Sequence, residues 1–404
     1  MVARRKRTVK RITVKRDDLQ WRVSNSLLIL VFGLMFLGYG IAEYDAQTAT
    51  GLLTIGGLPD MGGGTVILTP DPEWKYFKHD LIRSGQASGD GPDSAAAAWI
   101  FDTGTGKPIE GSPVTCGGKV IFGSADGHIY AVNNNTGQLL WKYPNQTVGV
   151  GAIYGSPACP GDTRVYFGSD DNKMRALKES DGTAIWTFQA GDKIKGSPIV
   201  DGGVVYFGSL DKKVYALTSD TGAQKWVTDT SYAIESGPAL SGTDLFIANN
   251  GYLGRLSTAG GSIADKDLIS IGGIPKPIIY MTTPAVDNTN KKVYAGEANG
   301  LQAGDTAKLT TKWKYMGVGA VRSGPIFSTD AMYVFFGSDN GKLYAVQTGA
   351  GGLQAGGLVW DFDTSVPVMT SIALSNSTPA PGDKIDIVFT AQYAGIESVS
   401  IGGN

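Results

Sequence analysis

The sequence predicts an all-β fold: a β-propeller of six to seven four-stranded blades, preceded by one transmembrane helix and followed by a partial immunoglobulin-like β segment. Three observations lead to this prediction. A pattern of about 42 residues recurs along the chain, glycine accounts for 57 of the 404 residues, and 20 uncharged residues follow a basic N-terminus. The glycine content is about twice the usual share of ~7% and indicates many tight turns between short strands.

Each copy of the repeat begins at a proline that often follows Gly-Ser. The six copies start at intervals of 44, 41, 40, 46 and 41 residues, at Pro113, Pro157, Pro198, Pro238, Pro284 and Pro325. Four copies continue into Phe-Gly-Ser, at residues 122–124, 167–169, 207–209 and 336–338. The last run of most copies carries a tryptophan, and one more tryptophan precedes the first copy: these are Trp99, Trp141, Trp186, Trp226, Trp313 and Trp360.

Every copy contains four runs of β-branched or aromatic residues separated by Gly, Asp and Asn, which predicts four antiparallel strands. A unit of this size cannot bury both faces of its sheet alone, so the copies must stack, and stacking around a ring gives a propeller. We expect the Gly-Ser-Pro starts to lie at the crowded central axis and the tryptophans to pack between blades at the rim. The extra strand around Trp99 leaves open whether the ring has six blades or seven.

The N-terminus carries the signals of a membrane segment. Residues 1–22 contain nine Lys and Arg against two Asp, which predicts a cytoplasmic tail. Residues 23–42 carry no charge and, as a helix, would just cross a bilayer core of about 30 Å. The positive-inside rule then places the propeller in the periplasm or outside the cell. A signal peptide cleaved near Ala42, which would release a secreted protein, is the alternative.

The regions that flank the propeller differ from it in composition. Residues 43–73 are rich in Gly, Thr and Pro and predict a flexible linker to a propeller at residues 74–364. Residues 365–404 include the alternating run 384–390 and predict the first strands of an immunoglobulin-like sandwich, with a short docked hairpin as the alternative. Beyond residue 22 the chain carries 26 basic and 35 acidic residues, which argues against nucleic acid as a partner.

Few residues in the sequence suggest covalent or metal chemistry. The repeat places Cys116 and Cys159 near the same corner of adjacent blades, so a disulfide is feasible in an exported protein, and two free thiols are the alternative. The two histidines, His79 and His128, exclude a site that needs several histidines. Three sequons, at Asn134, Asn145 and Asn376, would accept glycans in a host that has the machinery.

Two motifs, Gly-Ser-x-Asp-Gly-x-x-Tyr-Ala and Asp-x-x-Thr-Gly-x-x-x-Trp, resemble the PQQ-like (quinoprotein-type) β-propeller repeat over residues 74–364. Family members that bind pyrrolo-quinoline quinone typically have adjacent cysteines, a calcium ion on acidic and amide side chains, and a catalytic Asp. Cys116 and Cys159 are 43 residues apart, and residues 170–172 (Asp-Asp-Asn) are interpreted as turn residues. We therefore predict no catalytic residue, no PQQ, no calcium and no other metal.

These observations lead to a functional hypothesis and two alternatives. The hypothesis is a non-catalytic cell-surface scaffold, held in the membrane through residues 23–42, whose propeller engages a protein or glycan partner. The first alternative is an envelope-assembly scaffold, similar to the outer-membrane-assembly propellers of the same repeat family. The second is a quinone-dependent dehydrogenase, which the resemblance alone suggests.

Overall fold

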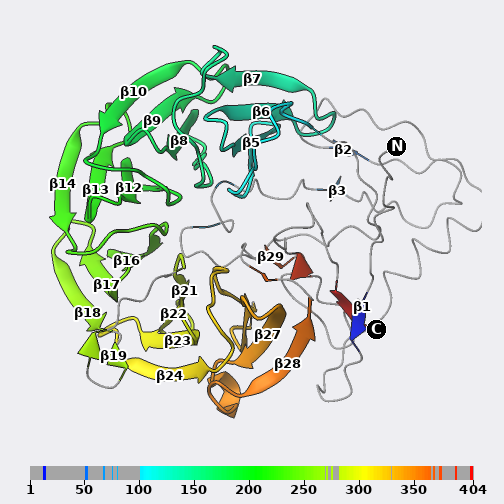
Figure 1. Ribbon diagram of the computed structural model, residues 1–404, viewed down its shortest axis with the longest axis vertical. Coiled ribbons are helices and arrows are strands. Elements are labelled where there is room, and N and C mark those ends of the chain that lie inside the picture. Colours follow the sequence, from blue (N-terminus) through cyan, green and yellow to red (C-terminus); the bar gives the residue numbers. More distant parts are fainter. Residues whose placement is uncertain are drawn as a thin grey trace, which may run out of the picture.

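Six sheets follow one another around a common centre, and the last strand of each sheet lies at the rim (Figure 1). The computed structural model of the chain describes residues 101–268, 282–328 and 330–364, Lys75, Asp80 and residues 367–368, together with short strands at 12–14, 51–52, 67–68, 270–271, 274–275, 373–374, 387–388 and 401–403. The sheets are antiparallel and keep their strands in chain order, as the repeat predicts for propeller blades.

We number the blades along the chain. Blade 1 contains β4 (Val114–Cys116), β5 (Lys119–Gly123), β6 (Ile129–Asn133) and β7 (Leu139–Tyr143). Blade 2 contains β8 (Arg164–Gly168), β9 (Lys173–Lys178) and β10 (Ala184–Gln189), with a single bridge from Ala158 to Tyr166 in the place of an innermost strand. Blade 3 contains β11 (Ile199–Asp201), β12 (Val204–Gly208), β13 (Lys213–Thr218) and β14 (Gln224–Asp229).

The remaining three blades have four strands each. Blade 4 contains β15 (Ala239–Ser241), β16 (Asp244–Ala248), β17 (Tyr252–Ser257) and β18 (Ile263–Leu268). Blade 5 contains β21 (Ala285–Asp287), β22 (Lys292–Glu297), β23 (Gly300–Asp305) and β24 (Thr311–Met316). Blade 6 contains β25 (Ile326–Phe327), β26 (Tyr333–Gly337), β27 (Lys342–Gln347) and β28 (Leu358–Asp363), with the 3₁₀ turn η1 (Ala350–Gly352) before β28.

Short strand pairs lie outside these blades. They are β1 (Ile12–Val14) with β31 (Ile401–Gly403), β2 (Gly51–Leu52) with β3 (Ile67–Leu68), β19 (Ser270–Ile271) with β20 (Ile274–Pro275), and β29 (Ala373–Leu374) with β30 (Ile387–Val388). Among the residues that the structure describes, no helix is long and apolar enough to cross a bilayer. The segment predicted to do so, residues 23–42, lies outside those residues, as do Trp99, His79 and Asn376.

The Gly-Ser-Pro starts crowd one another near the centre of the ring. A Cβ atom on Gly155 would lie 2.8 Å from the carbonyl oxygen of Lys195, and one on Gly196 would lie 2.3 Å from that of Ser236. The proline of each start directly precedes the first strand or bridge of its blade. Because backbone meets backbone here, only glycine leaves room for the next blade.

The tryptophans of four blades bind the next blade in one common way. Each indole Nε1–H donates to a carbonyl of the hairpin before the next blade's last strand, as from Trp141 to Glu179 (3.0 Å) and from Trp186 to Ser219 (2.7 Å). The ring also lies against a glycine of that hairpin with positive φ, such as Gly182 below Trp141. Trp226 and Trp313 repeat the arrangement with Thr258 and Thr348. The hairpin glycine is therefore the seat for the preceding blade's tryptophan.

Blade 4 lacks this tryptophan, and blade 5 compensates for the loss. Asp265 holds the register position that Trp226 holds in blade 3. In the facing hairpin of blade 5, Leu309 replaces the seat glycine at a φ of 49°, and its side chain is buried among core residues of both blades. The larger residue in blade 5 thus fills the space that the missing indole of blade 4 leaves at the junction.

Replacing Leu309 with glycine should lower the free energy of unfolding by roughly 1–4 kcal/mol, as measured by chemical denaturation. The cavity costs about 2–5 kcal/mol, and release of the left-handed backbone returns about 1 kcal/mol. Lys308→Gly, in the same hairpin but exposed, is the control and should change the value by less than about 1 kcal/mol. Equal stability of the two variants would show that Leu309 does not replace the indole.

Two observations at the ends of the ring favour a seventh blade. Phe101 packs against Phe122 and Tyr130 of blade 1 just as Phe188 of blade 2 packs against Phe207 and Tyr215 of blade 3. Phe101 thus holds the position that an outer-strand residue of a preceding blade would hold, whereas β28 already supplies the outer strand of blade 6.

The chain after blade 6 also continues the repeat. Val368 lies against Gly337 as Ile194 lies against Gly168. Strand β29 begins five residues after Val368, the interval that separates Ile194 from β11. This spacing fits the first strand of another blade at a position where the sequence suggested an immunoglobulin-like strand.

A candidate partner-binding groove between blades 1 and 2

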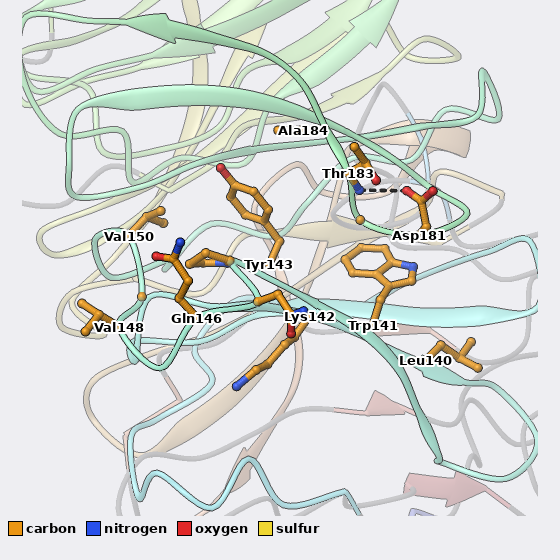
Figure 2. A pocket seen from close by; sticks show the side chains of 14 residues that line it. Leu140, Trp141, Lys142, Tyr143, Gln146, Val148, Val150, Asp181, Thr183 and Ala184 are labelled. Atoms are coloured by element: carbon orange, nitrogen blue, oxygen red, sulfur yellow. Dashed lines mark hydrogen bonds between the residues drawn. The ribbon is translucent and has the colours of Figure 1, made fainter.

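A groove of about 750 Å³ lies between the outer parts of blades 1 and 2 (Figure 2). It is lined by the free edge of β7, the loop after it and the hairpin before β10: Leu140, Trp141, Lys142, Tyr143, Pro144, Asn145, Gln146, Val148, Gly149, Val150, Asp181, Gly182, Thr183 and Ala184. Consecutive residues of β7 line the groove, so side chains from both faces of the strand reach it. The groove therefore follows the strand's edge.

The edge of β7 offers unpaired backbone groups. In the order of blade 1, β7 is the last strand, and no described strand pairs with its outer side. Such an edge is a template for another strand, and proteins commonly protect it with lysine. Strands β14 and β24 carry Lys225 and Lys312 directly before their tryptophans, where β7 carries Leu140. At the same position β10 carries Ile185 and β28 carries Val359, and β7 carries Lys142 after its tryptophan, so the edge of blade 1 lacks a lysine at this one position.

Exposed apolar side chains surround the edge. Leu139 and Leu140 are 47% and 48% exposed, Val148 is 78% exposed, and Ile185 on β10 is 38% exposed. Large apolar residues that gather on a surface, rather than lying singly, mark interaction sites. The groove between blades 1 and 2 therefore combines an outer strand edge with a lining in which exposed Leu140 and Val148 lie among polar side chains such as Asn145 and Gln146.

The loop that closes one end of the groove is longer than its counterparts. Between Trp141 and the next buried anchor, Ile153, there are 12 positions, whereas 8 separate Trp186 from Ile194 and 8 separate Trp226 from Ile234. The four additional residues fall in the segment 144–150, which we call the groove loop. Because the two junctions just compared have an interval of eight residues, the longer loop is not needed to connect two blades.

The groove loop is tied to the turn before β6 by backbone and side-chain contacts. Val150 N–H donates to the Gly127 carbonyl (2.9 Å), and the ring of His128 reaches the Gln146 carbonyl (Nε2 to O, 3.0 Å). Asp126 lies on the other side of that ring, with 3.3 Å between His128 Nδ1 and the carboxylate. The loop thus rests on the one buried histidine that the structure describes.

Asp126 remains ionised despite its burial. Burial acts to raise the pKa of its carboxyl, but hydrogen bonds from the His128 N–H, the Tyr130 hydroxyl and Thr105 outweigh it and hold the pKa below its usual value. Burial, followed by the bond to Asp126, raises the pKa of Tyr130, so its phenol stays protonated. The turn therefore presents a negative charge to His128.

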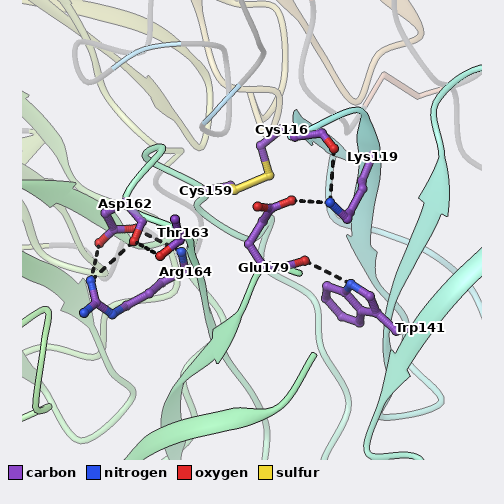
Figure 3. The surroundings of a disulfide bond; sticks show 9 residues. Cys116, Lys119, Trp141, Cys159, Asp162, Thr163, Arg164 and Glu179 are labelled. Atoms are coloured by element: carbon purple, nitrogen blue, oxygen red, sulfur yellow. Dashed lines mark hydrogen bonds and ion pairs between the residues drawn. A yellow bond between two sulfur atoms is a disulfide. The ribbon is translucent and has the colours of Figure 1, made fainter. Parts of the chain in front are cut away.

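Three further links hold blades 1 and 2 together beside the groove (Figure 3). Cys116 at the end of β4 and Cys159 form a disulfide, with Cα atoms 6.3 Å apart. Lys119 of β5 pairs with Glu179 at 2.5 Å, and the Glu179 carbonyl accepts the Trp141 indole proton. The groove thus lies at a junction that cannot easily open.

The residues singled out from the sequence have mostly structural positions. The repeat prolines and tryptophans that the structure describes serve the axis and the rim, and Asn134 and Asn145 are exposed, the latter at the groove. The sequence reasoning missed His128, Leu140 and the length of the groove loop. The interval of 12 rather than 8 residues after Trp141 was the available signal.

The described residues do not fit a quinone and calcium site of the kind that the resemblance implies. Among them, no three His, Cys, Asp or Glu side chains converge into a set that could hold a metal ion. Both cysteines are joined across two blades, so neither belongs to an adjacent pair. Asp171 of the acidic turn 170–172 instead pairs with Arg175.

The family model for outer membrane protein assembly factor BamB matches residues 125–352, more than half of the chain. Two solved structures share the fold. BamB from Moraxella catarrhalis superposes with a TM-score of 0.57 at 16% identity, covering 76% of this chain and 85% of that one. A europium-containing methanol dehydrogenase superposes with a TM-score of 0.60 at 14% identity, covering 82% of this chain and 90% of that one.

Curated relatives match shorter stretches. The dehydrogenase subunit of a quinone alcohol dehydrogenase from Komagataeibacter europaeus is 26% identical over 155 residues, 35% of this chain and 20% of that protein. Lupanine 17-hydroxylase from a Pseudomonas species is 26% identical over 200 residues, 45% of this chain and 27% of that protein. The matched parts span about a quarter or less of these relatives. The extent of the family-model match shows that the chain belongs to the PQQ-like repeat family of outer membrane protein assembly factor BamB.

Proposed function

We propose that the chain is a non-catalytic envelope scaffold that binds a protein partner in the groove between blades 1 and 2. The observation that carries the proposal is the groove along the outer edge of β7, with exposed Leu139 and Leu140 beside it and no lysine at the position that Lys225 and Lys312 hold in β14 and β24. The family to which the chain belongs supports an assembly role. Residues 23–42 would anchor the protein and place the propeller outside the cytoplasm.

An extended segment of the partner suits this groove better than a glycan. A strand added to β7 would satisfy the free backbone groups, and apolar side chains on its two faces would cover Leu139 and Leu140. The lining also holds polar side chains, among them Asn145, Gln146 and Asp181, but the outer strand edge and the exposed Leu140 and Val148 favour a protein over a glycan. The partner proposed is thus a protein with an exposed β-strand.

Leu140→Lys should reduce co-purification of the full-length protein with an outer-membrane barrel assembly complex from its own host by about tenfold or more, because a charge at an edge opposes strand pairing. Leu358→Lys is the matched control: Leu358 is also 48% exposed on an outer strand, but lies in blade 6. Equal retention by wild type and Leu140→Lys, or loss only with Leu358→Lys, would contradict the groove as the docking site.

The dehydrogenase alternative rests on the curated relatives. It predicts that the purified full-length chain, supplied with PQQ and calcium, oxidises a primary alcohol with transfer of electrons to a dye. Turnover above that of the cofactor alone would overturn the non-catalytic proposal, whatever the result with Leu140→Lys.

A further inference from the structure

Val148 is the most exposed large apolar side chain among the residues that the structure describes. It is 78% exposed, whereas Leu140, at the opposite end of the groove, is 48% exposed (Figure 2). The junction between blades 2 and 3 and that between blades 5 and 6 also contain an apolar residue, Ala190 and Val318, but these are 5% and 6% exposed. The groove loop thus exposes an apolar side chain where these junctions bury one.

The groove loop is held on both sides of Val148. Two residues before it, the carbonyl of Gln146 contacts the ring of His128, 3.0 Å from Nε2. Directly after it, a Cβ atom on Gly149 would lie only 2.3 Å from the Asp126 carbonyl oxygen, so backbone packs closely against backbone. The valine is therefore presented in a defined position before any partner arrives, which reduces the entropy lost on binding.

The regular part of the β7 edge is short. The pairing of β7 with β6 shifts its register at Leu140, which is the extra residue of a bulge. Beyond the bulge, only residues 141–143 continue the strand. Main-chain hydrogen bonds to such an edge are similar for every partner sequence, so they leave the register weakly specified, and side-chain pockets supply the specificity of strand addition. A strand that pairs with β7 therefore needs a further contact to fix its position.

We propose that Val148 is the specificity-determining residue of the groove: it enters an apolar pocket on the partner and thereby fixes the register in which the partner's strand lies on β7. The groove loop follows β7 directly and lines the same groove, so a strand on this edge runs toward Val148. Burial of the exposed valine then adds affinity in one register only. The inference rests on the docking role proposed above and adds an apolar pocket beside the partner's exposed strand.

The neighbours of Val148 favour a protein pocket over a lipid surface. Asn145, Gln146 and Thr147, which precede it, are exposed and polar. An apolar centre with a polar surround is typical of protein interfaces, whereas binding to a bilayer surface depends on a broad apolar face. The partner of this side chain is thus the same protein that supplies the strand.

Val148→Thr tests the inference with almost no change of shape. The new hydroxyl is exposed in the free protein, so thermal unfolding should not change, but in an apolar pocket it finds no hydrogen-bond partner. Co-purification of the full-length protein with the outer-membrane barrel assembly complex of its own host should fall about fivefold or more, the effect of burying an unpaired hydroxyl. Val227→Thr, at a 40% exposed position on β14, is the matched control and should retain the complex as wild type does.

A photo-crosslinking amino acid in place of Ala184 measures the register. Ala184 is exposed and lines the groove on the side opposite β7. With Val148 present, the probe should capture a single site on the partner. In Val148→Thr the captured sites should spread to positions two residues apart, because a strand that slips by two keeps its faces.

The outcomes separate this inference from the docking proposal. Equal retention by Val148→Thr and wild type, or a loss in which the probe still captures a single site, would overturn the role of Val148. Loss with Leu140→Lys alone would leave docking at the β7 edge in place and reject only the register contact. If neither variant reduced retention, the groove would not be the docking site and both proposals would be rejected.

Discussion

Gly196→Ala is expected to lower the free energy of unfolding by about 3 kcal/mol or more, the upper range for overpacking a close contact. The new Cβ atom would lie 2.3 Å from the Ser236 carbonyl oxygen. That backbone cannot move away freely, because Ser236 Oγ donates to the Ala248 carbonyl and Gly237 N–H donates to Thr283. Urea denaturation followed by tryptophan fluorescence measures the loss.

Gly260→Ala is the matched control for this substitution. No atom would lie within 4 Å of its new Cβ, and its φ is outside the left-handed range. It should change the free energy of unfolding by no more than about 0.5 kcal/mol. If the two alanine variants were equally stable, the starts of adjacent blades would not be in contact at the axis.

Removing the disulfide by Cys116→Ala with Cys159→Ala should cost about 4 kcal/mol, the chain-entropy value for a closed loop of 43 residues. The link joins two neighbouring blades, so its loss lets their junction separate before the rest of the ring unfolds. Thermal unfolding and exchange of blades 1 and 2 measure the effect under oxidising conditions.

Replacing both Lys119 and Glu179, as Lys119→Met with Glu179→Gln, gives the scale of a weaker link at the same junction. Their ion pair is largely buried, with side chains 16% and 17% exposed, and removing both partners leaves no unpaired charge, so the loss should be far smaller than that of a covalent bond. The disulfide variant should therefore be clearly the less stable of the two. An unchanged midpoint in the disulfide variant would indicate that blades 1 and 2 are held by packing alone.

Much of the fold could be predicted because every copy of the repeat has to satisfy the same packing requirements. Each copy needs glycine at the axis and an indole at the rim, so the residues at Gly196 and Trp186 recur with a fixed spacing. The predicted antiparallel four-stranded sheets are confirmed in most blades, and blade 2 replaces its innermost strand with the bridge at Ala158.

The candidate site could not be predicted in the same way, because it lies where the chain departs from the repeat. Leu140 is an ordinary strand residue in the sequence. Only the comparison with Lys225 and Lys312, which hold the same register in their strands, shows that β7 has no lysine at this position. In the sequence His128 is an isolated histidine. Only the structure shows that its ring contacts the carbonyl of Gln146, which is 18 residues away.

By itself, the sequence determined the class of fold, the register of the blades and the family resemblance, because alternation, turn glycines and repeat spacing are local properties of the chain. Only the tertiary structure decided that the outer edge of β7 lines a groove, that Leu309 fills the space of a missing indole, and that the ring of His128 contacts the groove loop. Those features depend on contacts between blades, and contacts across a blade junction leave no periodic signal in one sequence.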